Sequence, residues 1–358
     1  MILDAIELDE TQPVMRVLPP LSAQERDAVL LSLTGGSVID WTGLAFKDQD
    51  EVGAFFRLWL ADTSRDAWAR ERVRYVYNQA VEYLEEHLGL TFPAEVRRPK
   101  DVRDAFTRAS VRVGFNRNRV LYCAILKIVH VINHLEMQEL RNLCAIREVD
   151  LIALANERVQ RAAMTMREEG FPLRAFYGNR KTRPSVMTKL LAKREATAAT
   201  IFDKLRFRLV TEHRDDLVPA LGWLMRHLVP FAAIIPGESH NNLLSDAEVE
   251  AALRDAPELG RVLQPGAVQV NPDSGDVYRV INFICDLPVR VYDLPGVAPP
   301  ANRAMLGEAV PVLVEFQVVD SDTDVRNEAG QSRHTLYKAR QMSRVYERLG
   351  KSAGGKGR

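Results

Sequence analysis

The sequence has few cysteines, and their spacing does not suit a cross-linked or zinc-bound fold. Only three occur in 358 residues, at Cys123, Cys144 and Cys285, and none belongs to a Cys-x-x-Cys pair. A disulfide framework or a structural zinc site requires an even or clustered set of thiols. We therefore expect three reduced thiols that pack as small apolar side chains.

The sequence also lacks the features that are typical of a signal peptide or of a membrane-spanning helix. The first ten residues carry four acids, Asp4, Glu7, Asp9 and Glu10, and have neither the basic nor the apolar stretch of a signal peptide. No uninterrupted apolar run approaches the roughly 18 residues that a membrane helix needs. The expected location is the cytoplasm, without a membrane partner.

Net charge of either sign is absent. Lys and Arg number 48, as do Asp and Glu, so the formal net charge is zero, which argues against a protein that coats a polyanion. Between residues 174 and 214, however, eleven Lys and Arg residues accompany three acids. A local excess of this kind attracts the phosphates of a nucleotide or a nucleic acid. The alternative is a solvated basic surface.

Two common signatures are incomplete. The segment Thr-Gly-Gly-Ser at 34–37 lacks the lysine that follows a phosphate-binding glycine loop, and a turn is the simpler interpretation. His130 and His134 lie one helical turn apart, a spacing that can hold a metal, but no third ligand is evident. We expect both histidines to pack against neighbouring helices.

Length and hydrophobic periodicity predict two domains in an α+β fold. With 46% hydrophobic residues, a chain of this length can bury two cores. Helical spacing dominates 1–170, which we expect to be an all-helical region without an active site. A domain with a mixed sheet and flanking helices should follow at 171–350, and a disordered tail at 351–358. The stretches expected to be helical are 52–60, 67–88, 116–136, 138–169, 185–196, 215–228 and 331–349, and those expected to be strands are 171–177, 204–211, 278–285 and 312–319.

Two acids stand out among the predicted strands. Asp203 precedes a strand in which Arg206 and Arg208 share one face, and Glu315 lies inside the apolar strand Pro-Val-Leu-Val-Glu-Phe-Gln-Val-Val. A carboxylate in such a strand must be paired or metal-bound. Two carboxylates on neighbouring strands, surrounded by guanidinium and ammonium groups, suit phosphoryl transfer with Mg²⁺. A structural ion pair is the other reading of each acid.

Four blocks in this half resemble, in order, those of the synthetase domain of RelA/SpoT-type alarmone synthetases. Residues 183–189 resemble the Ser-x-x-x-Lys block, and Ile201-Phe202-Asp203 with Arg208 resembles the strand with the metal-binding aspartate. Residues 278–282, Tyr-Arg-Val-Ile-Asn, resemble Tyr-Arg-Ser-Ile-His. The fourth block, residues 315–318, Glu-Phe-Gln-Val, resembles Glu-x-Gln-Ile. It is followed by a further segment, 334–338, which resembles His-x-x-Tyr-Lys.

The resemblance implies a nucleotidyltransferase-like domain that transfers pyrophosphate from ATP to the 3′-hydroxyl of a guanosine nucleotide, giving a guanosine tetraphosphate-like product. It assigns Asp203 and Glu315 to catalysis and to Mg²⁺, and it assigns Tyr278 to stacking on guanine. The nucleotide-binding residues that it implies are Arg183, Ser185, Lys189, Arg206, Arg208, Tyr278, Gln317, His334 and Lys338. The ribosome and an oligomer are further partners that the family suggests.

The sequence also departs from the pattern of that family. Val280 and Asn282 replace its serine and histidine, Val319 and Asp320 follow the Glu-x-Gln block, and an insertion occupies about 236–271. No His-Asp dipeptide of the family's hydrolase domain occurs. Two alternatives stay open: transfer of pyrophosphate to tRNA, as in toxin-like relatives, and a non-catalytic module that binds a nucleotide or RNA on the same fold.

Overall fold

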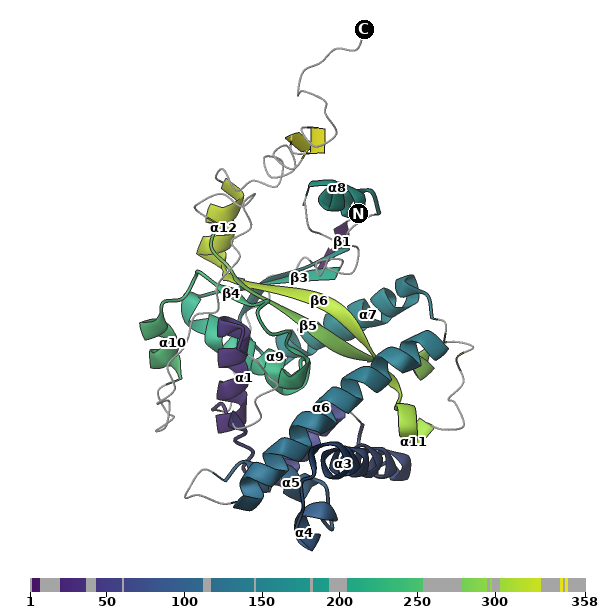
Figure 1. Ribbon diagram of the computed structural model, residues 1–358. Coiled ribbons are helices and arrows are strands. Elements are labelled where there is room, and N and C mark those ends of the chain that lie inside the picture. Colours follow the sequence, from purple (N-terminus) through teal and green to yellow (C-terminus); the bar gives the residue numbers. More distant parts are fainter. Residues whose placement is uncertain are drawn as a thin grey trace.

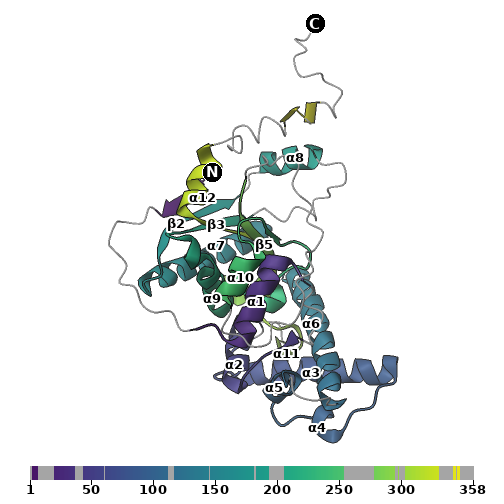
Figure 2. The ribbon, with the colours of Figure 1, turned by 90° about the vertical axis from the view of Figure 1, so that its left-hand side faces the viewer.

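The computed structural model has a mixed β-sheet at its centre with helices on both sides (Figures 1 and 2). It describes residues 2–6, 20–36, 43–59, 61–111, 117–144, 146–180, 183–192, 205–253, 278–294, 297, 303–329, 342–343 and 345–346. The strands are β1 (Ile2–Ile6), β2 (Leu173–Arg180), β3 (Leu205–Thr211), β4 (His240–Asn241), β5 (Ile281–Arg290) and β6 (Ala309–Asp320).

The helices occupy most of the first half of the chain and recur between the later strands. Those before β2 are α1 (Ala23–Thr34), α2 (Gln49–Trp59), α3 (Ala67–Leu88), α4 (Ala94–Arg97), α5 (Arg103–Ala109), α6 (Arg117–Leu143) and α7 (Glu148–Glu168). Those after β2 are α8 (Arg183–Ala192), α9 (Leu217–His227), α10 (Asp246–Ala252), α11 (Arg303–Leu306) and α12 (Ser321–Ala329).

Local sequence signals set several helix ends. Ser22 and Glu25 form a reciprocal capping box at the start of α1, which satisfies two backbone N–H groups that would otherwise lack acceptors. Helix α3 ends at Gly89, whose φ of 64° lies in the left-handed region that glycine adopts without steric cost. The predicted bounds of this helix, 67–88, are confirmed.

The sheet has the strand order β1-β2-β3-β6-β5-β4. Strands β3 and β6 are parallel neighbours at its centre, with Arg206 opposite Glu315 and Arg208 opposite Gln317. Strand β5 is antiparallel to β6 and places Asn282 opposite Gln317. Residues that face each other across strands project from the same face of a sheet, so this register decides which side chains meet.

One face of the sheet is apolar and carries a row of four phenylalanines. Phe176, Phe207, Phe316 and Phe283 come from four neighbouring strands, with successive ring centroids 5.5, 5.9 and 5.2 Å apart. Gly178 lies opposite Phe207, and a Cβ at that position would come within 3.2 Å of the Phe207 ring. Because Phe316 alternates with Glu315 and Gln317, the opposite face of β6 is polar.

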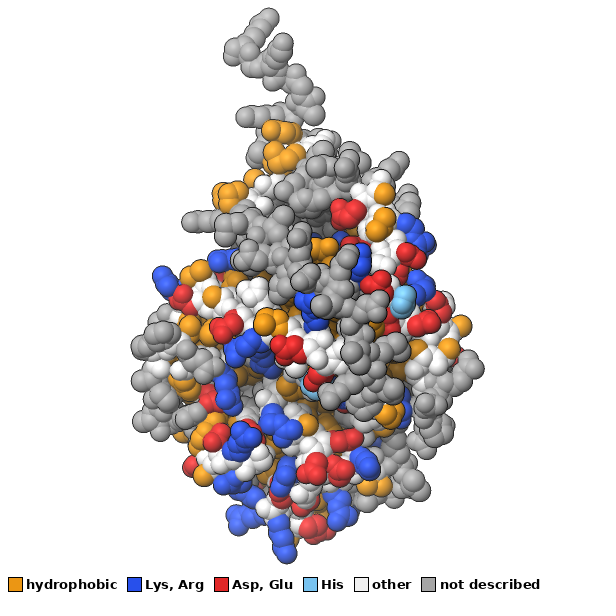
Figure 3. All heavy atoms as spheres, turned by 180° about the vertical axis from the view of Figure 1, so that it is seen from behind, with side chains coloured by type: hydrophobic (Ala, Val, Ile, Leu, Met, Phe, Trp, Pro, Cys, Tyr) orange, Lys and Arg blue, Asp and Glu red, His pale blue; other side chains and the backbone are white. Residues whose placement is uncertain are grey.

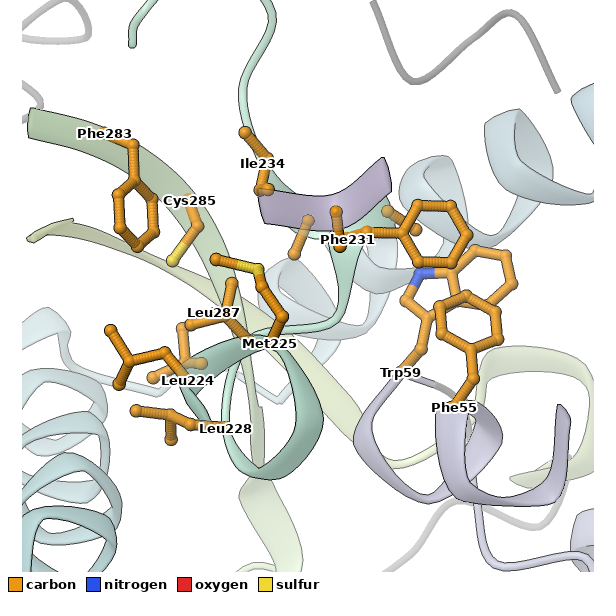
Figure 4. Close-up of a cluster of buried hydrophobic side chains, with 14 of the residues drawn as sticks. Phe55, Trp59, Leu224, Met225, Leu228, Phe231, Ile234, Phe283, Cys285 and Leu287 are labelled. Atoms are coloured by element: carbon orange, nitrogen blue, oxygen red, sulfur yellow. The ribbon is translucent and has the colours of Figure 1, made fainter. Parts of the chain in front are cut away.

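The early helices and the sheet share one hydrophobic core. Figure 4 shows Phe55 and Trp59 of α2 beside Phe231, while Leu224 of α9 and Leu287 of β5 lie next to each other. The ring centroids of Phe55 and Phe231 are 4.7 Å apart. A single cluster of buried side chains extends from Ala28 to Val319. Residue 170 therefore marks a change of element type within a common core, and the division into domains at this point stays a prediction.

The α+β class and the mixed sheet are confirmed, and some element bounds differ from those expected. The helical region that precedes the sheet is confirmed, with one exception that the sequence did not indicate: residues 2–6 form β1, which pairs with β2 at the edge of the sheet. The predicted break near residue 137 is wrong, because Met137 is buried in the continuous helix α6, and the chain turns only after Leu143. The tail 351–358 and most of 331–349 lie outside the described residues.

Helix α6 is the one described helix that is long and apolar enough to cross a membrane by length and composition. Its most apolar window has a mean hydropathy of 1.4, which the interrupted pattern of its sequence did not reveal. Core helices of soluble proteins meet the same criterion. Here α6 packs against α3, α5 and β6 in the helical layer below the sheet (Figure 1), where Ile125, Leu126 and Val129 are buried. Its other apolar side chains include four that are exposed, Val120, Val131, Leu135 and Leu143.

His130 and His134 on α6 do not form a metal site with other described residues. The His130 ring stacks on Trp59 with centroids 5.9 Å apart, and burial lowers its pKa to about 4. His134 Nδ1 lies 3.9 Å from Asp286 Oδ2 on β5. His130 thus packs against a neighbouring helix, as the sequence predicted, whereas the side chain of His134 is 48% exposed and lies beside a strand. The face of the molecule seen in Figure 3 carries both basic and acidic side chains, which agrees with the zero net charge of the sequence.

Candidate active site

Five of the predicted site residues meet on the polar face of the sheet. Arg206 and Arg208 alternate along β3, Glu315 and Gln317 alternate along β6, and Tyr278 lies three residues before the start of β5. Period-two alternation sends each pair to the face opposite the phenylalanine row. We refer to these five residues, Arg206, Arg208, Tyr278, Glu315 and Gln317, as the polar cluster.

Glu315 is held by two neighbours in the polar cluster. Its side chain is 8% exposed, its Oε2 accepts a hydrogen bond of 2.8 Å from Arg206 Nε, and its Oε1 accepts one of 3.1 Å from Gln317 Nε2. A carboxylate so deeply placed needs such partners to remain charged. Arg206 is more accessible than Glu315, with a third of its side chain exposed.

Arg208 connects the rest of the polar cluster to α12. One of its terminal nitrogens, Nη2, donates to Tyr278 Oη at 2.5 Å and to Gln317 Oε1 at 3.2 Å. The other, Nη1, lies 2.9 Å from Asp324 Oδ1 and 3.4 Å from Glu328 Oε1. Planar guanidinium groups suit this fixed, forked arrangement better than an ammonium group. Tyr278 is thereby oriented by the arginine that also orients Gln317.

The electrostatics of this network favour a permanently charged arginine. Burial lowers the pKa of the Arg208 guanidinium, but the Tyr278 oxygen and the carboxylates of Asp324 and Glu328 outweigh that effect and raise the pKa above its ordinary value. Burial raises the pKa of Asp324, and the Arg208 charge opposes the rise. Arg208 and Asp324, each 17% exposed, therefore depend on each other for compensation.

Four further polar residues on this face were not among the predicted site residues. Tyr177 and Asn179 of β2 lie opposite Arg208 and Arg206, and Asn282 and His240 continue the row beyond Gln317. Asn282 Oδ1 and His240 Nδ1 are buried and have no hydrogen-bond partner among the described residues. Burial lowers the pKa of His240, which favours its neutral form. The alternation of side chains along β2 could have identified Tyr177 and Asn179 as residues of this face. Strand β4 has only two residues, which is too short to show such a pattern around His240.

The remaining predicted residues are only partly described. Ser185 lies in the first turn of α8, the helix that also contains the backbone of Arg183 and Lys189, whose side chains are outside the described part. Asp203, His334 and Lys338 also lie outside the described residues. The expected meeting of Asp203 with Glu315 therefore stays a prediction, although the adjacency of β3 and β6 that it requires is confirmed.

The donor atoms at this site fit a hard cation. Mg²⁺ prefers oxygen ligands and is commonly held by one or two carboxylates together with substrate phosphates. Glu315 supplies one carboxylate, and Asp203 is the second that the sequence predicts. The described residues contain no group of three potential His, Cys, Asp or Glu ligands, so the phosphates of a substrate would have to complete the coordination.

Comparisons with known proteins give low similarity throughout. No family model matches the chain, and no curated protein matches it. The chain is similar to the solved structure of small alarmone synthetase 1 from Bacillus subtilis, with 13% identity and a TM-score of 0.27 over 61% of this chain and 87% of that one. The structure of the same synthetase bound to its product pppGpp has 14% identity to this chain and a TM-score of 0.29, over 55% of this chain and 85% of that one.

A GTP pyrophosphokinase family protein from Streptococcus pneumoniae gives 13% identity and a TM-score of 0.29, over 60% of this chain and 89% of that one. These are proteins of the kind that the four sequence blocks resemble. Identity and TM-score are too low for these likenesses to support an argument about activity, so the function has to be argued from the polar cluster.

Proposed function

We propose that this chain is a Mg²⁺-dependent pyrophosphokinase of the cytoplasm, which transfers pyrophosphate from ATP to the 3′-hydroxyl of a guanosine nucleotide. The observation that carries the proposal is the polar cluster, in which a buried glutamate, two arginines and a tyrosine lie on one face of adjacent strands. The order of the four sequence blocks supports the same conclusion.

The chemistry requires a base, positive charge and alignment. The acceptor oxygen attacks the β-phosphorus of ATP, the bond from that phosphorus to the oxygen bridging it to the α-phosphate breaks, and AMP leaves. In this proposal Glu315 would accept the proton of the attacking hydroxyl, since its carboxylate lies on the polar face of the sheet beside the partly exposed Arg206. Arg206 and Arg208 would stabilise the charge that spreads over the phosphate oxygens.

A bound Mg²⁺ would neutralise phosphate charge and hold the reacting groups in line, with Glu315 and Asp203 as its protein ligands. Arg206 then has a second role. It neutralises Glu315 before substrates bind, at an Nε to Oε2 distance of 2.8 Å, and it can release the carboxylate by turning toward an incoming phosphate. The one-third exposure of Arg206 permits that movement.

Two features support a purine nucleotide as the acceptor. Tyr278 offers a ring for stacking, and its hydroxyl is fixed by Arg208, which would hold the ring in one orientation. Asn282 Oδ1 is a buried acceptor without a partner among the described residues, and an N–H group of a base would satisfy it. Asn282 lies opposite Gln317, next to the polar cluster.

Labelled ATP incubated with Mg²⁺ and, separately, with GDP, GTP, AMP or tRNA tests this proposal. We expect a pyrophosphorylated product with GDP or GTP and none with AMP. A pyrophosphorylated product with tRNA and with no other acceptor would support the proposed reaction and show that the acceptor is tRNA. No product with any acceptor would contradict the proposal and favour a non-catalytic nucleotide-binding module, for which the engagement of both Glu315 oxygens by Arg206 and Gln317 is the supporting observation.

A further inference from the structure

A cavity with three arginines in its lining lies beside α12, outside the polar cluster. It has a volume of about 760 Å³ and is lined by residues that include Arg214, Asn242, Glu248, Arg279, Arg326 and Asn327. We refer to it as the arginine cleft. Asn242 and Glu248 belong to the insertion at about 236–271 that has no counterpart in the four sequence blocks. Figure 1 shows α10, from this insertion, on the same side of the molecule as α12.

The charges around the arginine cleft do not cancel. Arg214 Nε lies 2.7 Å from Glu248 Oε1, so this arginine is neutralised within the cleft. Arg279 donates to the backbone oxygen of Asn242 at 2.9 Å, and Arg326 donates to Asp322 O at 3.1 Å, which are neutral acceptors. Among the described residues neither of these two arginines pairs with a carboxylate. Two guanidinium charges on one cavity wall attract an anion.

Hydrogen bonds between side chains and the backbone hold the walls of the arginine cleft in place. Asn327 on α12 accepts a hydrogen bond of 3.0 Å from Arg279 N and donates one of 2.8 Å to Arg279 O. Asn242 accepts from Val280 N at 2.7 Å and donates to Tyr278 O at 2.8 Å. Asn327 is 3% exposed. The backbone that carries Arg279 is therefore fixed on both sides, and a ligand would meet a pre-organised surface.

Size and lining together indicate the class of ligand. Cavities of several hundred Å³ accommodate a small molecule of the size of a nucleotide. Guanidinium groups bind phosphate oxygens through paired N–H donors, and the nearly buried side chains of Leu243 and Leu244 add an apolar wall. We propose that the arginine cleft is a second binding site, separate from the candidate active site, for a free nucleoside di- or triphosphate.

Helix α12 connects this cleft to the polar cluster. Thr323, Arg326 and Asn327 line the cleft, while Asp324 and Glu328 of the same helix hold Arg208. A nucleotide that binds Arg326 therefore acts on the helix that positions Arg208, and through it Tyr278. The binding claim depends only on the cleft, so it stands or falls independently of the reaction proposed above.

Hydrogen–deuterium exchange of the full chain locates the ligand, with ATP, GTP and inorganic tripolyphosphate as probes. We expect the nucleotides to slow exchange in residues 242–252 and 321–329. The double variant Arg279→Gln/Arg326→Gln should lose this protection, with the affinity falling about tenfold for each guanidinium removed. The control Arg65→Gln/Arg147→Gln removes the same charge at positions 86% and 77% exposed and should keep it.

The same measurement on Glu315→Gln separates this site from the candidate active site, because protection at α10 should survive that substitution. Protection that is unchanged in the Arg279→Gln/Arg326→Gln variant would overturn the proposal, and so would the absence of protection with every probe. Protection by an RNA oligonucleotide without any by the free nucleotides would also overturn it, since the cleft would then bind a nucleic acid backbone.

Discussion

Arg206 and Glu315 face each other across parallel central strands, with Arg206 Nε 2.8 Å from Glu315 Oε2. The pair brings a carboxylate and a guanidinium group to one point on the sheet without the help of a loop. Their strands are fixed from below by the phenylalanine row, in which Phe207 and Phe316 alternate with these residues. The position of the charged pair is thus set by the packing of the opposite face of the sheet.

Replacement of Glu315 by glutamine should abolish pyrophosphate transfer and leave ATP binding nearly intact. The substitution keeps the shape and removes both the charge and the proton acceptor, and loss of a general base costs about 10²–10⁴-fold in rate. Single-turnover kinetics and equilibrium binding of ATP measure the two effects separately. Lys189→Ala serves as the contrast, because a lost phosphate contact should weaken ATP binding itself. Equal rates for Glu315→Gln and the unmodified protein would remove Glu315 from the mechanism.

Substitutions of Tyr278 should act on the acceptor. Tyr278→Phe keeps the ring and removes the hydroxyl that bonds Arg208, whereas Tyr278→Ala removes the stacking surface as well. Base stacking on an aromatic side chain contributes about 1–3 kcal/mol, so the alanine variant should raise KM for the acceptor about tenfold or more and leave KM for ATP unchanged. The phenylalanine variant should show the smaller change. A rise in KM for ATP, with KM for the acceptor unchanged, would show that Tyr278 contacts ATP and would contradict this prediction.

The Arg208 and Asp324 pair should show strong energetic coupling. Arg208→Met leaves the half-buried Asp324 carboxylate without its main partner, and breaking such a pair costs about 3 kcal/mol of stability. The double variant with Asp324→Asn should recover part of that loss, because no charge then remains uncompensated. Urea unfolding of the four proteins in a double-mutant cycle gives the coupling. Strictly additive losses would show that the ion pair does not stabilise the fold.

His130 should make the protein less stable in acid. Burial lowers its pKa from an ordinary value near 6.5 to about 4, so the unfolded chain takes up a proton between these values while the folded chain does not. Stability is complete above about pH 6.5 and is lost as the pH falls toward 4, by about 2 kcal/mol at pH 5. Urea unfolding at pH 7 and pH 5 measures the difference. The variant His130→Gln should show a smaller loss, and an identical loss would assign the effect to other groups.

The sequence predicted the parts of the fold that have a strong local pattern. Strand β3 was readable because Leu205, Phe207 and Leu209 alternate with two arginines, and α3 because its apolar spacing runs unbroken to Gly89. Strand β1 was missed because its pairing with β2 is a contact between residues far apart in the chain, which local periodicity does not report.

The site was predictable to the extent that its residues lie in such patterns. The sequence showed Glu315 and Arg206 as charged residues within apolar strands. That they lie directly opposite each other follows only from the pairing of β3 with β6. Asp324 and Glu328, which hold Arg208, lie between the segments 315–318 and 334–338, in a helix that the pattern did not indicate. His240 and Asn242 come from the insertion, whose position beside β5 is set by hydrogen bonds to Val280 and Tyr278.

The adenosine product formed from ATP is the most direct measure of the central claim. Transfer of pyrophosphate breaks ATP between its α- and β-phosphates, so chromatography should show one AMP for each acceptor modified, and a label on the β-phosphate should move to the acceptor. Glu315→Gln should form neither. Formation of ADP with transfer of the γ-phosphate alone, or of AMP and labelled acceptor at the same rate by Glu315→Gln, would contradict the account.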